Sequence, residues 1–202
     1  MAVITISRQL GSLGSRIAHQ VAEHLAFCVV WREAINRAAR QAGAPEMALA
    51  EIDELGLLEL TPTPEEQHAY HQALEQVMDD LADRGSCVII GRAGQVLLRD
   101  RRDAFHVKIM ASAELRARRV AQVRSIPIEA ARAQIETSDR SRRAYLECCF
   151  GERWDDPELY DLIINTSRLS PETAAIIICQ AFERFLREEP LHILPKGKFG
   201  VD

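Results

Sequence analysis

Short apolar runs that alternate with helical patterns constrain the fold of this chain more than any other feature. Each run has the length of one strand, and the segments between runs carry apolar residues at helical spacing, as in Ile17, Val21 and Leu25. Strands of a parallel sheet are buried on both faces and read as continuous apolar stretches. We therefore expect an α/β fold of three layers, a five-stranded parallel sheet with helices on both faces. The predicted strands are Val3–Ile6, Phe27–Val30, Cys87–Ile90, Phe105–Met110 and Leu162–Ile164.

The length and composition fit one folded domain. A chain of 202 residues can bury a full core, and no apolar run approaches the ~20 residues that span a bilayer. The N-terminal residues show neither a basic region nor a cleavage site, so we expect a cytoplasmic protein with no membrane partner. The five cysteines are odd in number and lack CxxC spacing, which argues against disulfides or structural zinc. No third ligand accompanies His68 and His71, and the metal content stays unknown.

Charge is distributed unevenly along the chain. The formal net charge is -5, which argues against general nucleic-acid binding. Residues 41–83 hold eleven Asp and Glu and no Lys or Arg, whereas residues 99–143 hold twelve Lys and Arg against six Asp and Glu. The second region is therefore suited to attract anions.

Three segments fit the alternation poorly. Residues 41–64 are acidic and end in a Thr-Pro-Thr-Pro stretch, which suggests a helical insertion closed by a rigid linker. Residues 124–157 combine arginines with helix formers but show no strand pattern, as expected for a mobile helical flap over the sheet. The tail from residue 190 onward is rich in proline and glycine and is expected to pack loosely.

A glycine-containing turn, Ser7–Arg16, follows the first predicted strand and leads directly into a helix. Open parallel sheets bind ligands at the carboxyl ends of their strands, and a helix N-terminus offers free N–H groups to a phosphate. The position is that of a P-loop, yet the GxxxxGK(S/T) motif is not satisfied, because no lysine lies between Met1 and Phe105. The alternative interpretation is a tight turn in which Ser12 or Ser15 caps the helix.

Arginines gather at three further places. Gly91-Arg92 follows the third predicted strand directly. Arg116 and Arg119 lie one helical turn apart, a spacing that by itself favours a solvent-facing run. In the stretch from Thr137 to Arg143, three arginines fall within four residues and would repel one another unless they met anions. Guanidinium groups match phosphate oxygens, so this cluster favours a functional role.

The order of these motifs resembles the cytidylate kinase-like family, relatives of bacterial cytidylate kinase among the P-loop nucleoside monophosphate kinases. The matching stretches are ITISRQLGSLGSRIA, CVIIGRAGQVLL, FHVKIMAS with ELRARR, SDRSRRAYLE and WDDPELYDLIINTSRLSPE. The resemblance implies a single domain, with a core of residues 1–123 and 158–186, an acceptor region at 31–86, a helical lid at about 124–157 and a loose tail at 187–202. It also implies that the first and third strands are neighbours, and that ATP and Mg²⁺ are cofactors.

The resemblance assigns site residues by position. The phosphate-binding loop would comprise Arg8, Gly11, Ser12, Gly14, Ser15 and Arg16. The acceptor would be bound by Gly91 and Arg92. The lid would contribute Arg116, Arg119, Asp139, Arg140, Arg142 and Arg143, of which we expect the last three to be solvated in the absence of ligand. The catalytic residues would be Arg16, Arg140 and Arg143.

The first loop departs from the parent kinases at its most important positions. An ungapped alignment places Arg8 at the first motif glycine, Gly14 at the lysine and Arg16 at the Ser/Thr that would bind Mg²⁺. The leading hypothesis is an ATP-dependent phosphotransferase acting on a nucleoside monophosphate or a similar anionic acceptor. The alternative is a nucleotide-binding sensor or partner-binding protein with little kinase activity. Nucleic-acid binding ranks third, and the oligomeric state stays open.

Overall fold

A computed structural model describes residues 2–43 and 63–187 of the chain. Strands and helices alternate along the chain as the apolar runs predict. The strands are β1 (Val3–Arg8), β2 (Cys28–Val30), β3 (Cys87–Ile90), β4 (Ala104–Met110) and β5 (Leu162–Asn165). The helices are α1 (Gly14–Leu25), α2 (Arg32–Gln41), α4 (Pro64–Arg84), α5 (Gly94–Leu97), α6 (Ala113–Arg124), α7 (Ile128–Phe150), the short 3₁₀ helix η1 (Pro157–Leu159) and α8 (Pro171–Phe185).

All five strands form one parallel sheet in the order β2-β3-β1-β4-β5. The predicted pairing of the first and third strands is confirmed, with Val3 opposite Cys87 and Ile6 opposite Ile90. This register places the end of β1 beside the turn after β3. A polar pair lies inside the sheet between β1 and β4, where Thr5 Oγ1 and His106 Nδ1 are 2.7 Å apart.

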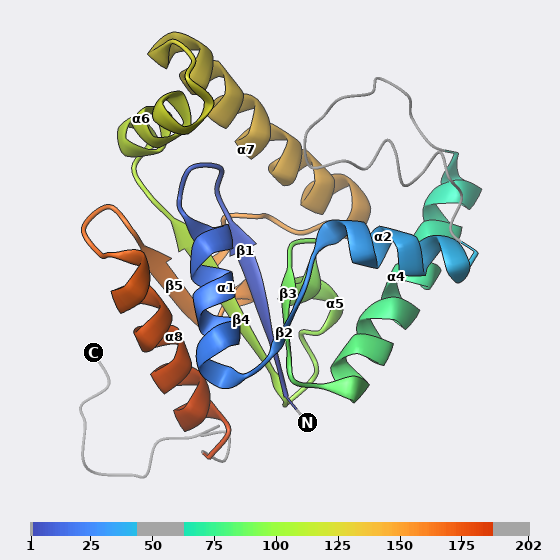
Figure 1. The fold of residues 1–202 in the computed structure, drawn as a ribbon. Coiled ribbons are helices and arrows are strands. Elements are labelled where there is room, and N and C mark those ends of the chain that lie inside the picture. Colours follow the sequence, from blue (N-terminus) through green and yellow to red (C-terminus); the bar gives the residue numbers. More distant parts are fainter. Residues whose placement is uncertain (1, 44–62, 188–202) are drawn as a thin grey trace, which may run out of the picture.

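Helices cover both faces of the sheet, as expected for parallel strands (Figure 1). α1 and α8 pack on one face, against side chains such as Ile4, Ile6 and Val107. On the other face α4 packs against β1 and β3, and its apolar residues Tyr70, Leu74, Val77 and Met78 are buried there. Two separate apolar clusters therefore hold the strands in place and fix the edge at which they end.

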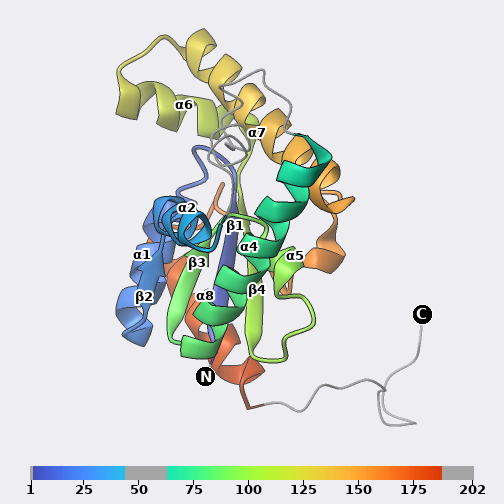
Figure 2. The same ribbon diagram turned by 90° about the vertical axis from the view of Figure 1, so that its right-hand side faces the viewer.

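α6 and α7 form a helical hairpin beyond the carboxyl ends of the strands, above the β1–α1 loop (Figures 1 and 2). Ala117, Val120, Ala131 and Ile135 pack between the two helices, and Leu10 of the loop packs against them. The second half of α7 belongs to the main core, because Tyr145 and Leu146 join the cluster around α4. Packing thus ties this hairpin to the sheet at both ends.

The strand predictions hold to within two residues, and Cys87–Ile90 matches residue for residue. β1 continues through Ser7 and Arg8, because these polar residues pair with Lys108 and Ile109 of β4. The predicted helical flap, residues 124–157, contains one long helix, α7, and the helix that pairs with it, α6, lies before the predicted start. Most of the acidic insertion and of the C-terminal tail lie outside the described residues.

Candidate active site

The β1–α1 loop turns sharply between Arg8 and Gly14. Gly11 has φ +80°, and Leu13 precedes the helix in the left-handed conformation at φ 66°. Ser12 is fully buried, and its hydroxyl donates to the carbonyl of Gln9 at 2.8 Å. No side-chain hydrogen bond caps α1 at Leu13, so the interpretation of Ser12 as a helix cap is wrong. The first turn of α1 therefore keeps its N–H groups directed toward the loop.

Both glycines of the loop occupy positions where a side chain would collide. A Cβ on Gly11 would lie 2.7 Å from the carbonyl oxygen of Arg116, because α6 rests on the loop. A Cβ on Gly14 would lie 2.5 Å from the Cβ of Arg8. The loop is thus closely packed against α6 on one side and beneath the side chain of Arg8 on the other.

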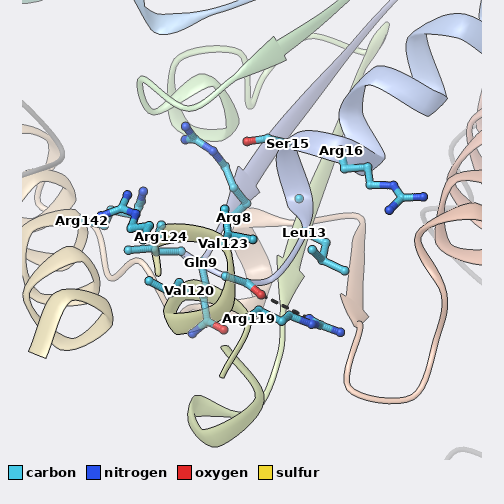
Figure 3. Close-up of a pocket in the computed structure, with 13 residues that line it drawn as sticks. Arg8, Gln9, Leu13, Ser15, Arg16, Arg119, Val120, Val123, Arg124 and Arg142 are labelled. Carbon is cyan, nitrogen blue, oxygen red and sulfur yellow. Dashed lines mark hydrogen bonds between the residues drawn. The ribbon is translucent and has the colours of Figure 1, made fainter. Parts of the chain in front are cut away.

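A cavity of about 350 Å³ opens between this loop and the α6–α7 hairpin (Figure 3). Its walls combine cationic and apolar side chains. Among the lining residues are Arg8, Arg119, Arg124, Arg142, Leu13, Val120 and Val123. Val123 is 83% exposed, which is unusual for valine in a folded domain. Such a cavity suits a ligand that joins an anionic group to a flat apolar one.

A second, smaller cavity of about 20 Å³ adjoins the first. Arg8 and Arg142 line both cavities, and Arg92 enters the smaller one from the turn after β3. Gly91, Arg92 and Ala93 all have positive φ between 53° and 76°, and this strained turn leaves Arg92 only 1% exposed. Among the described residues that line the smaller cavity, none is acidic. Three arginines border this small space, and their positive charge suits an oxygen of an anionic group such as a phosphate.

Buried polar residues hold the wall of the small cavity in place. Trp154 donates from its indole Nε1 to Ser7 Oγ at 2.9 Å. Lys108, which is 4% exposed, donates to the carbonyl of Trp154 at 2.7 Å and to Asp155 at 3.0 Å. Burial acts to raise the pKa of Asp155, but hydrogen bonds from Arg143 and Lys108 outweigh it and lower that pKa. Sequence reasoning missed this cluster, although a lysine in an apolar strand is itself a signal that a partner must exist.

Two arginines of α6, Arg116 and Arg119, donate hydrogen bonds to other parts of the protein. Arg116 pairs with Asp139 at 2.8 Å, and both side chains are less than 10% exposed. Arg116 also donates to the carbonyls of Ala111 and Leu10. Arg119 donates to the carbonyls of Gly11 and Thr166. These contacts fasten the α6–α7 hairpin to the phosphate loop.

The three predicted catalytic arginines do not lie in one site. Arg16 contacts the large cavity at its rim, but its guanidinium points away and donates to Glu172 at 2.7 Å (Figure 3). Arg140 and Arg143 line a separate groove formed by α6 and α7, and Arg143 pairs with Asp155 at 2.8 Å. The structure does not bring these three together. The expectation that Arg142 is solvated is wrong, because it is 8% exposed between the two cavities.

The lining residues fit a phosphorylated nucleotide better than they fit a magnesium ion. Within the described residues, no carboxylate lines either cavity. Residues 2–43 and 63–187 also contain no group of three or more His, Cys, Asp or Glu side chains placed to bind a metal. These side chains do not form a magnesium site of their own, whereas the arginines suit ATP phosphates.

Comparisons with known proteins agree on family and fold. The model of the cytidylate kinase-like family matches residues 3–168. A cytidylate kinase of Sulfurisphaera tokodaii is 29% identical over 191 residues, which cover 94% of this chain and 99% of that protein. An uncharacterized protein from Eubacterium ventriosum has a similar crystal structure, with a TM-score of 0.72 and 19% identity over 91% of this chain and 98% of that one. Shikimate kinase from Acinetobacter baumannii matches with a TM-score of 0.52 and 16% identity over 91% and 94% of the two chains. No helix in the described part of the chain is long and apolar enough to cross a membrane.

Proposed function

Because the chain belongs to the cytidylate kinase-like family, we propose that it transfers the terminal phosphoryl group of ATP to a nucleoside monophosphate or a similar anionic acceptor. The observation that carries this proposal is the pair of adjoining cavities at the carboxyl edge of the sheet, which share Arg8 and Arg142. A phosphotransferase needs two phosphate sites that meet at one point, and the two arginines shared by the cavities support such an arrangement here.

The large cavity is the donor site in this proposal. The first turn of α1 offers backbone N–H groups and the positive end of the helix dipole to the ATP phosphates. The apolar side chains of Leu13, Val120 and Val123 give the nucleoside a surface on which to pack. A ligand there would also cover Val123, whose exposure otherwise has a cost in water.

The small cavity is the acceptor phosphate site. Arg92 and Arg142 would bind the acceptor's phosphate oxygens, and Tyr145 lines the same space. Burial raises the pKa of the Tyr145 hydroxyl well above its usual value, so this group stays neutral and able to donate a hydrogen bond. The cavity holds only a small group, so the rest of the acceptor would extend toward the region 31–86.

Phosphoryl transfer asks little covalent chemistry of a protein, and catalysis consists mainly of positioning and of charge stabilisation. In this chain the positioning is supplied by the buried arginines and by the Trp154–Ser7 hydrogen bond behind them. We place the activity in the cytoplasm, where ATP and nucleoside monophosphates are abundant.

A second candidate is a nucleotide-binding protein with little turnover. It is favoured by Gly14 at the motif's lysine position and by a guanidinium on Arg16 that is occupied with Glu172. Such a protein would bind ATP in the large cavity and signal its presence through the α6–α7 hairpin.

An ADP-release assay across CMP, dCMP, UMP, AMP and GMP, with calorimetry of ATP binding alongside, separates the two candidates. The kinase proposal expects acceptor-dependent ADP release that falls steeply in an Arg92→Met variant and persists in Arg118→Ala, whose side chain is 70% exposed outside both cavities. ATP binding without acceptor-dependent release on any of the five would favour the sensor. No ATP binding would refute both.

A further inference from the structure

In the β1–α1 loop, the residue types at two positions of the phosphate-binding motif are interchanged. In GxxxxGK(S/T) the first position is glycine, and the lysine that reaches the phosphates comes six residues later. In this chain the first position is Arg8 and the later one is Gly14. The long cation and the glycine have therefore changed places.

Packing explains why the two positions depend on each other. A Cβ on Gly14 would lie 2.5 Å from Arg8 Cβ and 3.0 Å from Arg8 Cγ. Contacts below 3.0 Å do not occur for real Cβ atoms, and the obstructing atoms belong to the root of the Arg8 side chain, which cannot swing away. Any residue other than glycine at position 14 would displace Arg8, and only glycine at position 8 would remove both obstructing atoms and leave room for lysine.

The Arg8 side chain also points to the place where donor and acceptor meet. It extends past Ser15 (Figure 3) and lines the small cavity together with Gly91 and Arg92 of the turn after β3. It lines the large cavity and the small one, next to Arg142 in both. Arg16, the other cation of the loop, has its guanidinium on Glu172 and lies away from this junction.

We propose that Arg8 contacts the phosphoryl group in transfer and supplies the positive charge that a P-loop lysine supplies in other kinases. The assignment rests on the proposed function. An acceptor phosphate oxygen forms a bond to the γ-phosphorus while the bond from that phosphorus to the β–γ bridging oxygen breaks, and the electron pair leaves with ADP. Arg8 remains protonated throughout and donates N–H hydrogen bonds to the oxygens on which negative charge accumulates.

The test is a set of substitutions at the two positions, with turnover, ATP affinity and urea unfolding measured for each. The variants are Arg8→Ala, Arg8→Lys, Gly14→Lys, Arg8→Gly/Gly14→Lys and, as the control arginine outside both cavities, Arg118→Ala. We expect Arg8→Ala to reduce kcat about 100-fold or more, the usual effect of removing one transition-state donor, with folding retained. Gly14→Lys should be inactive or unstable because of the collision.

The double variant carries the decisive expectation. Arg8→Gly/Gly14→Lys moves the cation to position 14 and removes the collision with the side chain at position 8. This variant should be at least about tenfold more active than Arg8→Ala and more stable than Gly14→Lys. The effects of the two substitutions would then be non-additive. An Arg8→Ala variant that folds and keeps kcat within threefold of the wild type would overturn the assignment.

Failure of the proposed function looks different. A wild-type protein that binds ATP but transfers no phosphoryl group refutes the proposed kinase activity. The ATP affinity of Arg8→Ala then tests whether Arg8 contacts the phosphates. A tenfold or greater loss of affinity in Arg8→Ala would support it, and unchanged affinity would overturn it.

Discussion

Replacing Asp139 by Asn removes the charge that neutralises Arg116 inside the α6–α7 hairpin. The two side chains are 5% and 9% exposed and are joined by hydrogen bonds of 2.8 and 3.2 Å. Removing one partner of a buried pair typically costs ~3–5 kcal/mol, because the other charge stays buried and uncompensated. Arg116 keeps its hydrogen bonds to the carbonyls of Leu10 and Ala111, so we expect the lower end, about 3 kcal/mol.

Urea unfolding of the wild type and of Asp139→Asn measures this cost directly. Arg140→Ala is the matched control, because it changes the next residue of the same helix at an exposed position and should stay within about 0.5 kcal/mol. The double variant Arg116→Met/Asp139→Leu removes both charges and should be far less destabilised than Asp139→Asn. A loss below about 1 kcal/mol for Asp139→Asn would refute the idea that this pair holds the hairpin on the loop.

Three further predictions concern stability. Burial lowers the pKa of His106 despite the opposing charge of Asp161, so the unfolded chain binds more protons between that lowered pKa and the ordinary value of 6.5. The free energy of unfolding should therefore fall as the pH drops below 6.5, and a pH series should show a flatter slope for His106→Asn. Gly11→Ala meets a positive φ of 80° and a carbonyl at 2.7 Å, so thermal melts should show a loss of at least ~1–3 kcal/mol. Lys108→Met removes one of the two donors to the Trp154 carbonyl, the other being the Tyr160 hydroxyl, and one of the two cationic partners of Asp155, and urea unfolding should show a loss of roughly 1–3 kcal/mol.

Much of the fold could be predicted from the sequence because a buried parallel strand has a simple pattern. Cys87–Ile90 is apolar at every position and buried at every position, so its limits were recovered. The end of β1 was missed because Ser7 and Arg8 look like loop residues. Their strand conformation depends on β4, which lies about a hundred residues away in the chain.

The arginines of α7 show what the site prediction lacked. Successive helical residues point about 100° apart, so Arg142 points to a different side of the helix from Arg140 and Arg143. Ile135 and Tyr145 mark the buried face, and Arg142 lies on it at helical spacing, three residues before Tyr145. This signal was present in the sequence and would have separated the buried arginine from its exposed neighbours.

The contact made by Arg16 could not be predicted from any local sequence pattern. Its position in the motif alignment suggests a phosphate contact, yet Glu172 at the start of α8 takes its guanidinium. That partner lies 156 residues further along the chain, so only the packing of α8 beside α1 reveals the pair. The link between Arg8 and Gly14 likewise depends on a contact. An alignment shows only that the motif's first glycine and its lysine are both replaced, whereas the structure shows that the two positions touch and depend on each other.

Transfer of radioactive label from [γ-³²P]ATP to a nucleoside monophosphate tests the central claim most directly. CMP is the first acceptor to use, followed by the other four monophosphates, with products separated by thin-layer chromatography. The account predicts label in a nucleoside diphosphate with the wild type and at least about 100-fold less in Arg8→Ala, while Arg118→Ala behaves as the wild type. Label that stays in ATP or appears only as inorganic phosphate with every acceptor would contradict the account.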